Sequence, residues 1–162
     1  MQDSKIKKEK TIEELNAIAD KVVDGFFAVH RHLGPGFKEG VYEASLIEEY
    51  RQQNLSVQSQ VELPVFYKGV NLNKKYKLDL LIEDEIIVEL KTVEDISSLH
   101  KAQLLSYMKL AGKRLGYVAN FNVVMMKEGI KRMRLDSGTK FHTDRIVNTI
   151  KYAGPNKPNS YD

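Results

Sequence analysis

The sequence predicts an α/β domain in which a mixed sheet packs against helices. Three observations support this prediction. Apolar residues recur at helical spacing over residues 12–53, and short β-branched runs separated by turns then fill residues 57–90. A further helical pattern and two more apolar runs extend to about residue 135. Three consecutive strands favour a meander, and the helix before the fourth strand permits a parallel crossover.

The N-terminal part is predicted to be a pair of helices. Thr11 and Glu14 have the spacing of a capping box, so the first helix is expected over residues 12–32. Segment 33–36 contains two glycines and a proline, which end that helix. A second helix is expected over residues 38–53. Its predicted core face consists of Val41, Ala44, Leu46, Ile47 and Tyr50.

Five strands are predicted in the rest of the chain. The first covers residues 57–67 and contains Pro64, which lacks an N–H group and therefore indicates an edge strand or a bulge. The second and third form a hairpin over residues 72–90. The remaining predicted elements are an N-cap at Ser97 or Ser98, a helix over 99–111, strands over 115–121 and 130–135 with a turn near 128–129, and a final helix over 143–152.

The composition indicates a globular chain of ordinary size. Its 162 residues suffice for one core, so we expect a single domain over residues 1–162. The core is expected at about residues 12–135, with flexible ends at 1–10 and 154–162. The 42% hydrophobic and 29% charged fractions are those of a folded protein. The chain has no cysteine, which excludes disulfides, thiolate metal sites and a cysteine nucleophile.

Charge and hydropathy restrict the class of partner. The net charge of +3 permits a phosphate-rich partner without requiring one. No apolar run approaches the roughly 18 residues that span a bilayer, and the first ten residues lack the apolar region of a signal peptide. We therefore expect a cytoplasmic protein with no membrane association.

A polar cluster is predicted within the central hairpin. A three-residue turn centred on Asp84 places Asp79 opposite Glu89, on one face of the sheet. Lys91 lies two residues beyond Glu89 and therefore on the same face. Carboxylates among Leu, Ile and Val are costly to bury unless they are paired or bind a metal. The cluster therefore indicates a functional site, although a solvent-facing acidic pair balanced by Lys91 would give the same pattern.

Two further pairs of polar residues have helical spacing. Gln103 and Tyr107 are four residues apart and share one face of the predicted third helix. Taken alone, this pair is more typical of the rim of a core than of a functional site. Glu39 and Glu43 are also one turn apart, and Glu43 is favoured for a site because apolar residues follow it directly on the helix.

Several other residues receive a structural interpretation. His30 and His32 are expected to pack or to lie on the helix surface, because no histidine-rich metal spacing surrounds them. A set of basic residues is open to two interpretations, as a solvated face or as a surface that follows a nucleic-acid backbone. This set comprises Lys74, Lys75, Lys77, Lys127, Lys131, Arg132 and Arg134.

The hairpin residues resemble a known signature. Asp79, followed by Glu89-x-Lys91 at the end of an apolar strand, resembles the D…(D/E)xK signature of the PD-(D/E)XK nuclease superfamily. Leu78 stands where that family often has proline. The order of helix, three strands, helix and strand is also similar to the restriction-endonuclease-like core of that superfamily.

Two more motifs extend the resemblance to most of the chain. Gln103-x-x-x-Tyr107 resembles the QxxxY motif in the nuclease domains of recombination helicases. Gly36-x-x-Glu39-x-x-Tyr42 resembles the signature of the GxxExxY protein family, a branch of the same superfamily. Together the motifs cover roughly residues 12–135.

The resemblance implies a metal-dependent nuclease that uses Mg²⁺ or Mn²⁺. The implied catalytic residues are Asp79, Glu89, Lys91, Glu43, Gln103 and Tyr107. The implied metal ligands are Asp79, Glu89, Glu43 and the backbone carbonyl of Leu90. Roles in support of these ligands or in substrate contact are implied for Glu39, Tyr42 and His100.

Three functions are compatible with these observations. The first is a metal-dependent nuclease acting on DNA, in repair, recombination or defence. The second is a catalytically silent module on the same fold that binds nucleic acid or a protein. The third is a subunit that works as a homodimer, through the exposed edge at the Pro64 strand, or within a larger repair or defence complex.

Overall fold

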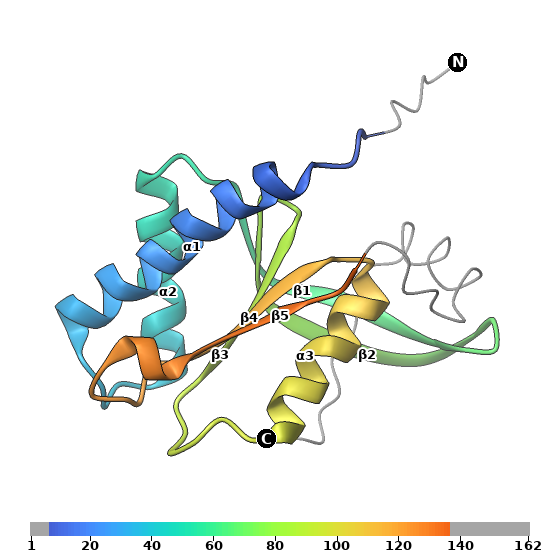
Figure 1. The fold of residues 1–162 in the computed structure, drawn as a ribbon. Coiled ribbons are helices and arrows are strands. Elements are labelled where there is room, and N and C mark those ends of the chain that lie inside the picture. Colours follow the sequence, from blue (N-terminus) through green and yellow to red (C-terminus); the bar gives the residue numbers. More distant parts are fainter. Residues whose placement is uncertain (1–6, 137–162) are drawn as a thin grey trace.

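The computed structural model describes residues 7–136 (Figure 1). Their elements are α1 (Ile12–Leu33), α2 (Glu39–Gln52), β1 (Val57–Tyr67), β2 (Val70–Ile82), β3 (Ile86–Lys91), α3 (Ser98–Ala111), β4 (Leu115–Asn120), the 3₁₀ helix η1 (Met126–Gly129) and β5 (Ile130–Arg134). These confirm the helices and strands predicted up to residue 135, with bounds that differ by no more than two residues. The helix predicted over 143–152 and the tail at 154–162 lie outside the described residues. Across residues 7–136, no helix has both the length and the apolar character needed to cross a bilayer.

The five strands form one mixed sheet in the order β1-β2-β3-β4-β5. Neighbouring strands are antiparallel except β3 and β4, which are parallel. A parallel pair needs a long connection, and α3 supplies it. The predicted mixed α/β fold with a meander and a crossover helix is therefore confirmed.

Helices cover the sheet from two sides (Figure 1). A larger core lies under α1 and α2, where Phe26, Tyr42 and Phe121 are fully buried. A smaller core lies under α3 and contains Leu104 and Tyr107. We call these the α1/α2 core and the α3 core. The side of the sheet that a strand residue faces therefore decides which helices it can meet.

The two N-terminal helices meet closely at Gly25. The hydroxyl of the fully buried Tyr50 donates a hydrogen bond of 2.8 Å to the carbonyl oxygen of Val22. Burial raises the pKa of Tyr50 well above its usual value, so the hydroxyl keeps its proton. A Cβ atom at Gly25 would overlap the Tyr50 ring. Glycine is therefore required where α2 crosses α1.

The core face of α2 differs in part from the prediction. Leu46 and Tyr50 are buried as expected, but Val41 is 41% exposed and Ala44 is also exposed. Tyr42 takes the core position instead, so that the buried residues lie four apart along the helix. A tyrosine fits there because its hydroxyl donates to the carbonyl of Gly34 at 2.6 Å and accepts from the N–H of Phe37 at 3.1 Å.

Pro64 lies in the edge strand of the sheet, as predicted. β1 is the first strand in the sheet order, and its pairing with β2 shifts register between Pro64 and Phe66. The missing N–H group of Pro64 is tolerated at such a position. Both predicted alternatives, an edge strand and a bulge, are therefore present together.

Residues 7–10 contact the body of the protein, although the sequence predicted a flexible segment there. Lys7 pairs with Asp84 at 3.0 Å, and Glu9 pairs with Arg114 at 3.2 Å. Partial burial raises the pKa of Asp84, but hydrogen bonds from Lys7 and Lys113 outweigh it and hold that pKa below its usual value. The first pair connects residue 7 to the turn between β2 and β3, and the second connects residue 9 to the segment between α3 and β4.

Replacing Gly25 by alanine should destabilise the protein. Overlap with Tyr50 is expected to lower the free energy of unfolding by about 1–3 kcal/mol in urea denaturation. Gly40→Ala is the matched control, because a Cβ atom at this helical glycine meets no atom within 4 Å. That control should leave stability unchanged or raise it by up to about 1 kcal/mol. Equal stability of the two variants would contradict the close crossing.

Candidate active site where β2 separates from β3

The central hairpin opens at Asp79. β2 pairs with β3 from Ile82, opposite Ile86, to Leu80, opposite Val88. This is the register predicted from the turn at Asp84. Beyond Leu80, β2 stays paired with β1 and leaves β3, which continues beside β4 (Figure 1). We call the point of separation, at Asp79 and Glu89, the fork.

Carboxylates replace backbone carbonyls as acceptors at the fork. The N–H of Asp79 donates to Oε1 of Glu89 at 3.1 Å. The N–H of Leu90 donates to Oδ2 of Asp79 at 2.9 Å. Each carboxylate is thus held by the strand opposite its own. Hydrogen bonds to charged acceptors are the stronger kind, so they fix both side chains where the ladder ends.

At the fork, the strand face that packs against the α1/α2 core becomes the face that packs against the α3 core. Leu80 belongs to the α1/α2 core, but Leu78 belongs to the α3 core, although strand alternation would place both on one side. The same exchange separates Val57 from Val61 in β1. Gln60 lies between them with a φ of 51°, a left-handed conformation that is uncommon for a non-glycine residue. The hairpin therefore turns over at Gln60 and Asp79, which brings groups from both layers together.

Gln60 joins the carboxylate of α2 to that of β2. Its Nε2 donates to the two carboxylate oxygens of Glu43, at 3.0 and 3.2 Å, and lies 3.5 Å from Oδ1 of Asp79. The amide nitrogen thus lies between two carboxylates that would otherwise repel each other. The sequence analysis missed Gln60, because one polar residue in an edge strand carries no spacing signal.

Glu89 and Lys91 lie on the α3 side of the sheet. They lie two and four residues after Ile87 of the α3 core, on the same strand face, and are 2% and 5% exposed. Two ionisable groups this deeply buried need compensation by opposite charge, hydrogen bonds or a metal ion. The structure thus places Glu89, Lys91 and Asp79 around the fork, and brings Glu43 to it through Gln60.

Asn120 fixes the end of β3 that carries Lys91. This side chain, 1% exposed, accepts from the N–H of Val93 at 3.1 Å and donates to its carbonyl at 2.8 Å. The N–H of Phe121 donates to the carbonyl of Lys91 at 3.0 Å. The sequence analysis missed Asn120, although a lone amide in the apolar run of residues 115–121 was the available signal.

Gln103 and Tyr107 are buried under α3. Tyr107 is fully buried in the α3 core, with its ring centroid 5.8 Å from that of Tyr76. Gln103 is 4% exposed, and its Nε2 has no hydrogen-bond partner among residues 7–136. An unsatisfied buried donor costs about 1–3 kcal/mol, so an acceptor supplied by a ligand would be stabilised there.

Of the other three candidate residues, His100 and Tyr42 make hydrogen bonds to local backbone. The Nδ1 of His100 accepts from the N–H of Ser97 at 3.1 Å and completes the capping box of α3. Both hydrogen-bonding roles of the Tyr42 hydroxyl are taken by the loop before α2. Glu39 is the exposed first residue of α2.

The oxygen atoms at the fork suit a hard cation. Carboxylate and carbonyl oxygens are the ligands that Mg²⁺ and Mn²⁺ prefer. The carbonyl of Leu90 points toward the fork, because N–H and C=O of one strand residue point the same way and this N–H reaches Asp79. As arranged, no three Asp, Glu, His or Cys side chains within residues 7–136 surround a common ion position. The amide of Gln60 takes the place between Glu43 and Asp79.

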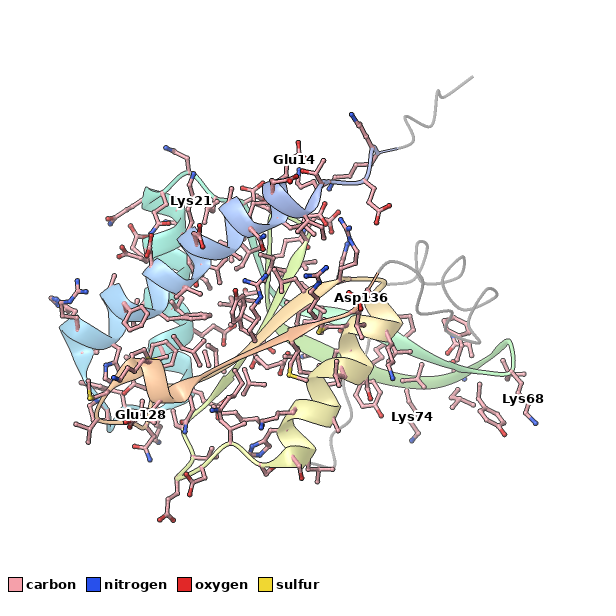
Figure 2. The ribbon with its side chains drawn as sticks, in the orientation of Figure 1. Glu14, Lys21, Lys68, Lys74, Glu128 and Asp136 are labelled. Atoms are coloured by element: carbon pink, nitrogen blue, oxygen red, sulfur yellow. The ribbon has the colours of Figure 1, made fainter. Side chains whose placement is uncertain are left out.

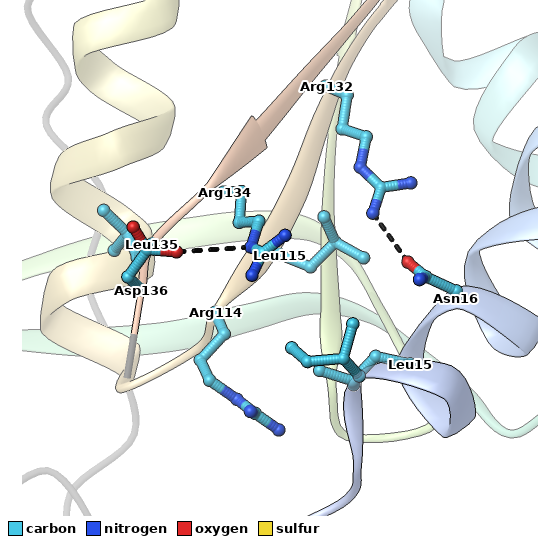
Figure 3. Close-up of a pocket in the computed structure, with 9 residues that line it drawn as sticks. Leu15, Asn16, Arg114, Leu115, Arg132, Arg134, Leu135 and Asp136 are labelled. Atoms are coloured by element: carbon cyan, nitrogen blue, oxygen red, sulfur yellow. Dashed lines mark hydrogen bonds and ion pairs between the residues drawn. The ribbon is translucent and has the colours of Figure 1, made fainter. Parts of the chain in front are cut away.

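A small cavity at the other end of the sheet is a different feature (Figure 3). It has a volume of about 90 Å³ and is lined by Leu15, Leu115 and three arginines, among other residues. Leu115 pairs with Ile86 at the start of β3, whereas Glu89 and Lys91 lie at its end. Arg132 donates to Asn16 at 2.8 Å, and Arg134 pairs with Asp136 at 3.4 Å. These arginines therefore have local structural partners.

The predicted set of basic residues does not form one surface. Lys74, Lys75 and Lys77 lie on β2, whereas Lys131, Arg132 and Arg134 lie on β5, with β3 and β4 between them. Sequence spacing could not reveal this separation, because it depends on the strand order.

His30 packs as expected. Its Nε2 lies 2.8 Å from the carbonyl of Val123, and the side chain is buried. His32 lies on the surface of α1. Neither histidine has a role at the fork.

Comparison with known proteins shows that the residues of the fork lie within a family match. Residues 16–133 match the model of the PD-(D/E)XK nuclease superfamily. Searches of curated proteins and of solved structures return no match. The match runs from α1 to β5 and includes the residues of the fork. The mixed five-stranded sheet with its helices agrees with the restriction-endonuclease-like fold of that superfamily.

Removing the amide of Gln60 should strengthen Mn²⁺ binding. Gln60→Leu retains the bulk but removes the donor between Glu43 and Asp79, so an incoming ion no longer displaces it. We expect a dissociation constant several-fold lower than that of the wild type in isothermal titration calorimetry.

Gln58→Leu is the control for this experiment, because it changes an exposed glutamine on the same strand. It should leave the dissociation constant unchanged. Weaker Mn²⁺ binding by Gln60→Leu would show that the amide helps to hold the ion, and would contradict displacement.

Proposed function

The chain belongs to the PD-(D/E)XK nuclease superfamily, and from this premise we propose that it hydrolyses phosphodiester bonds of DNA with the help of Mg²⁺ or Mn²⁺. The observation that supports the proposal is the fork. There Asp79 and Glu89 are held by backbone N–H groups of opposite strands, and Lys91 is buried on the same face as Glu89.

We propose that Asp79, Glu89, Glu43 and the carbonyl of Leu90 hold the ion. A divalent ion bound there would supply a water of lowered pKa and neutralise charge on the phosphate. The hydrogen bonds from Asp79 and Leu90 pre-set the orientation of two of these ligands before any ion arrives. The Gln60 amide bridges Glu43 to Asp79, and an arriving ion would displace it.

Lys91 is proposed to act on the phosphate itself. A buried ammonium group stabilises negative charge that develops on phosphate oxygens more strongly than a hydrated one, because the local dielectric constant is low. It also orients the attacking water. The bonds that Asn120 and Phe121 make with residues 91–93 keep the lysine backbone in place during the reaction.

Gln103 is proposed to donate a hydrogen bond to a phosphate oxygen. Its buried amide nitrogen lacks an acceptor within the described residues and so matches a ligand that brings one. Tyr107 lies one turn further along α3, and we propose that it keeps this part of the helix packed against the sheet.

Several finer assignments are part of the proposal. Gly36, Glu39 and Tyr42 support membership of the GxxExxY branch. A cytoplasmic location, a homodimer through the edge strand β1, and a larger repair or defence complex stay predictions. A single domain over residues 1–162 is likewise still a prediction.

One observation favours a second function, a catalytically silent module that binds nucleic acid or a protein. The carboxylates of Glu43 and Asp79 are already bridged by Gln60, and no three-ligand metal position is formed within residues 7–136. A silent module would bind its partner equally well with EDTA and with Mg²⁺, without cleavage. A nuclease requires the metal for turnover.

Loss of Asp79 or Lys91 should slow cleavage strongly. We expect Asp79→Asn and Lys91→Ala each to slow metal-dependent nicking of supercoiled DNA by about 10²–10³-fold, because each removes a charge that acts on the transition state. Lys21→Ala, at an exposed position of α1, is the matched control and should nick at the wild-type rate.

Circular dichroism verifies that the variants fold, since Lys91→Ala leaves Glu89 buried with less compensation. Nicking at the wild-type rate by both folded variants would rule out the proposed site.

A further inference from the structure

The β1–β2 hairpin continues beyond the core as a narrow two-stranded ribbon. Leu63 and Leu78 belong to the α3 core, and Tyr76 packs against it. We call residues 64–75, which lie beyond them, the arm. Figure 1 shows that the arm extends past α3, away from the body of the protein. Its tip is a two-residue turn at Lys68 and Gly69, both with positive φ, which is the turn that twisted hairpins favour.

The arm is basic at its tip and at its base. It carries Lys68, Lys74 and Lys75 and no acidic residue. The net charge of the arm is therefore +3, the same as that of the whole chain. All three lysines are exposed. Figure 2 shows Lys68 at the tip and Lys74 along the ribbon, both directed away from the body. Lys75 pairs with Glu62 at 3.3 Å, but both side chains are more than half exposed, so that pair is weak.

The tip of the arm also exposes apolar surface. Tyr67, Val70 and Leu72 are 59%, 61% and 43% exposed. The Nζ of Lys68 lies 5.3 Å from the centroid of the Tyr67 ring. A cluster of exposed apolar side chains rimmed by polar groups is typical of a surface that contacts another molecule.

The arm and the fork share a strand. Lys77 lies two residues from Asp79 on β2, and Lys75 lies four residues from it. A strand rises about 3.3 Å per residue, so the lysines of the arm lie about 13–35 Å from the fork. A long ligand bound along the arm can therefore extend along β2 as far as Asp79.

We propose that the arm docks on duplex DNA and delivers a backbone phosphate to the fork. This inference rests on the proposed function, which it extends by naming the form of the substrate. Two paired strands about 4.8 Å apart form a ribbon that the roughly 12 Å wide major groove admits. The lysines lie against phosphates, and Tyr67 and Val70 reach the base edges and sugars. The strong positive charge of the arm complements the phosphate backbone.

The test measures duplex binding separately from hydrolysis. Fluorescence anisotropy of a labelled 20-base-pair duplex in EDTA compares the wild type with K68Q/K74Q/K75Q. We expect at least about tenfold weaker binding of the duplex by the variant near 0.1 M salt. The slope of the logarithm of the binding constant against the logarithm of the salt concentration should also fall in magnitude by about 1 for each lysine that contacts a phosphate. The control K8Q/K21Q/R31Q removes the same charge from exposed positions outside the arm and should lose less than about twofold.

A second variant tests the apolar tip. Y67S/V70S should weaken duplex binding with an unchanged salt slope, because it removes no charge. Single-stranded DNA of the same sequence should bind more weakly than the duplex to the wild type. Docking is overturned if the arm variant binds the duplex as the control does, or if the single strand binds as tightly as the duplex. Binding to anionic vesicles in place of DNA would also overturn it.

Hydrolysis of bis(p-nitrophenyl) phosphate separates this inference from the proposed function. The small diester does not need the arm, so K68Q/K74Q/K75Q should hydrolyse it at the wild-type rate in Mn²⁺. If the wild type hydrolyses neither this diester nor DNA while the arm variant still loses duplex binding, the proposed function fails and docking stands. If hydrolysis is normal and the arm variant binds the duplex normally, docking fails and the proposed function stands.

Discussion

The separation of β2 from β3 at Asp79 is the constraint on which the rest of the site depends. A sheet that opens leaves backbone groups without ladder partners, and buried backbone groups are costly to leave unpaired. Here side-chain carboxylates accept those bonds, at 3.1 Å from Asp79 to Glu89 and at 2.9 Å from Leu90 to Asp79. The same bonds that end the ladder therefore position two acidic groups.

The opening also joins the two layers of the protein. α2 brings Glu43 from the α1/α2 side, and Glu89 and Lys91 lie on the α3 side. The reversal of the strand faces at Gln60 places Asp79 between them. Buried charge of this kind does not favour folding by itself, since desolvation offsets much of the attraction. A function that needs concentrated charge at the fork explains the presence of the buried Glu89 and Lys91 better than stability does.

Sequence patterns predicted the elements and the cluster of Asp79, Glu89 and Lys91, but neither the separation of β2 from β3 nor the contacts that complete the site. The turn at Asp84 set the register in which Leu80 faces Val88, and alternation placed Glu89 and Lys91 on one face. Gln60 could not be predicted, because its role depends on a left-handed backbone and on the approach of α2. Val41 was wrongly placed in the core, since the hydroxyl bonds of Tyr42 decided which face of α2 turned inward. The separation of the basic residues onto β2 and β5 required the strand order.

The most direct test of the central claim is a Mn²⁺ titration followed by the electron paramagnetic resonance signal of the free ion. Wild-type protein and Asp79→Asn are compared at equal concentration and at low salt. The account predicts one ion bound by the wild type and at least about tenfold weaker binding by the variant, because a charged ligand at the fork is lost. Identical isotherms for the two proteins would contradict a metal site at the fork and would leave its carboxylates with a structural role alone.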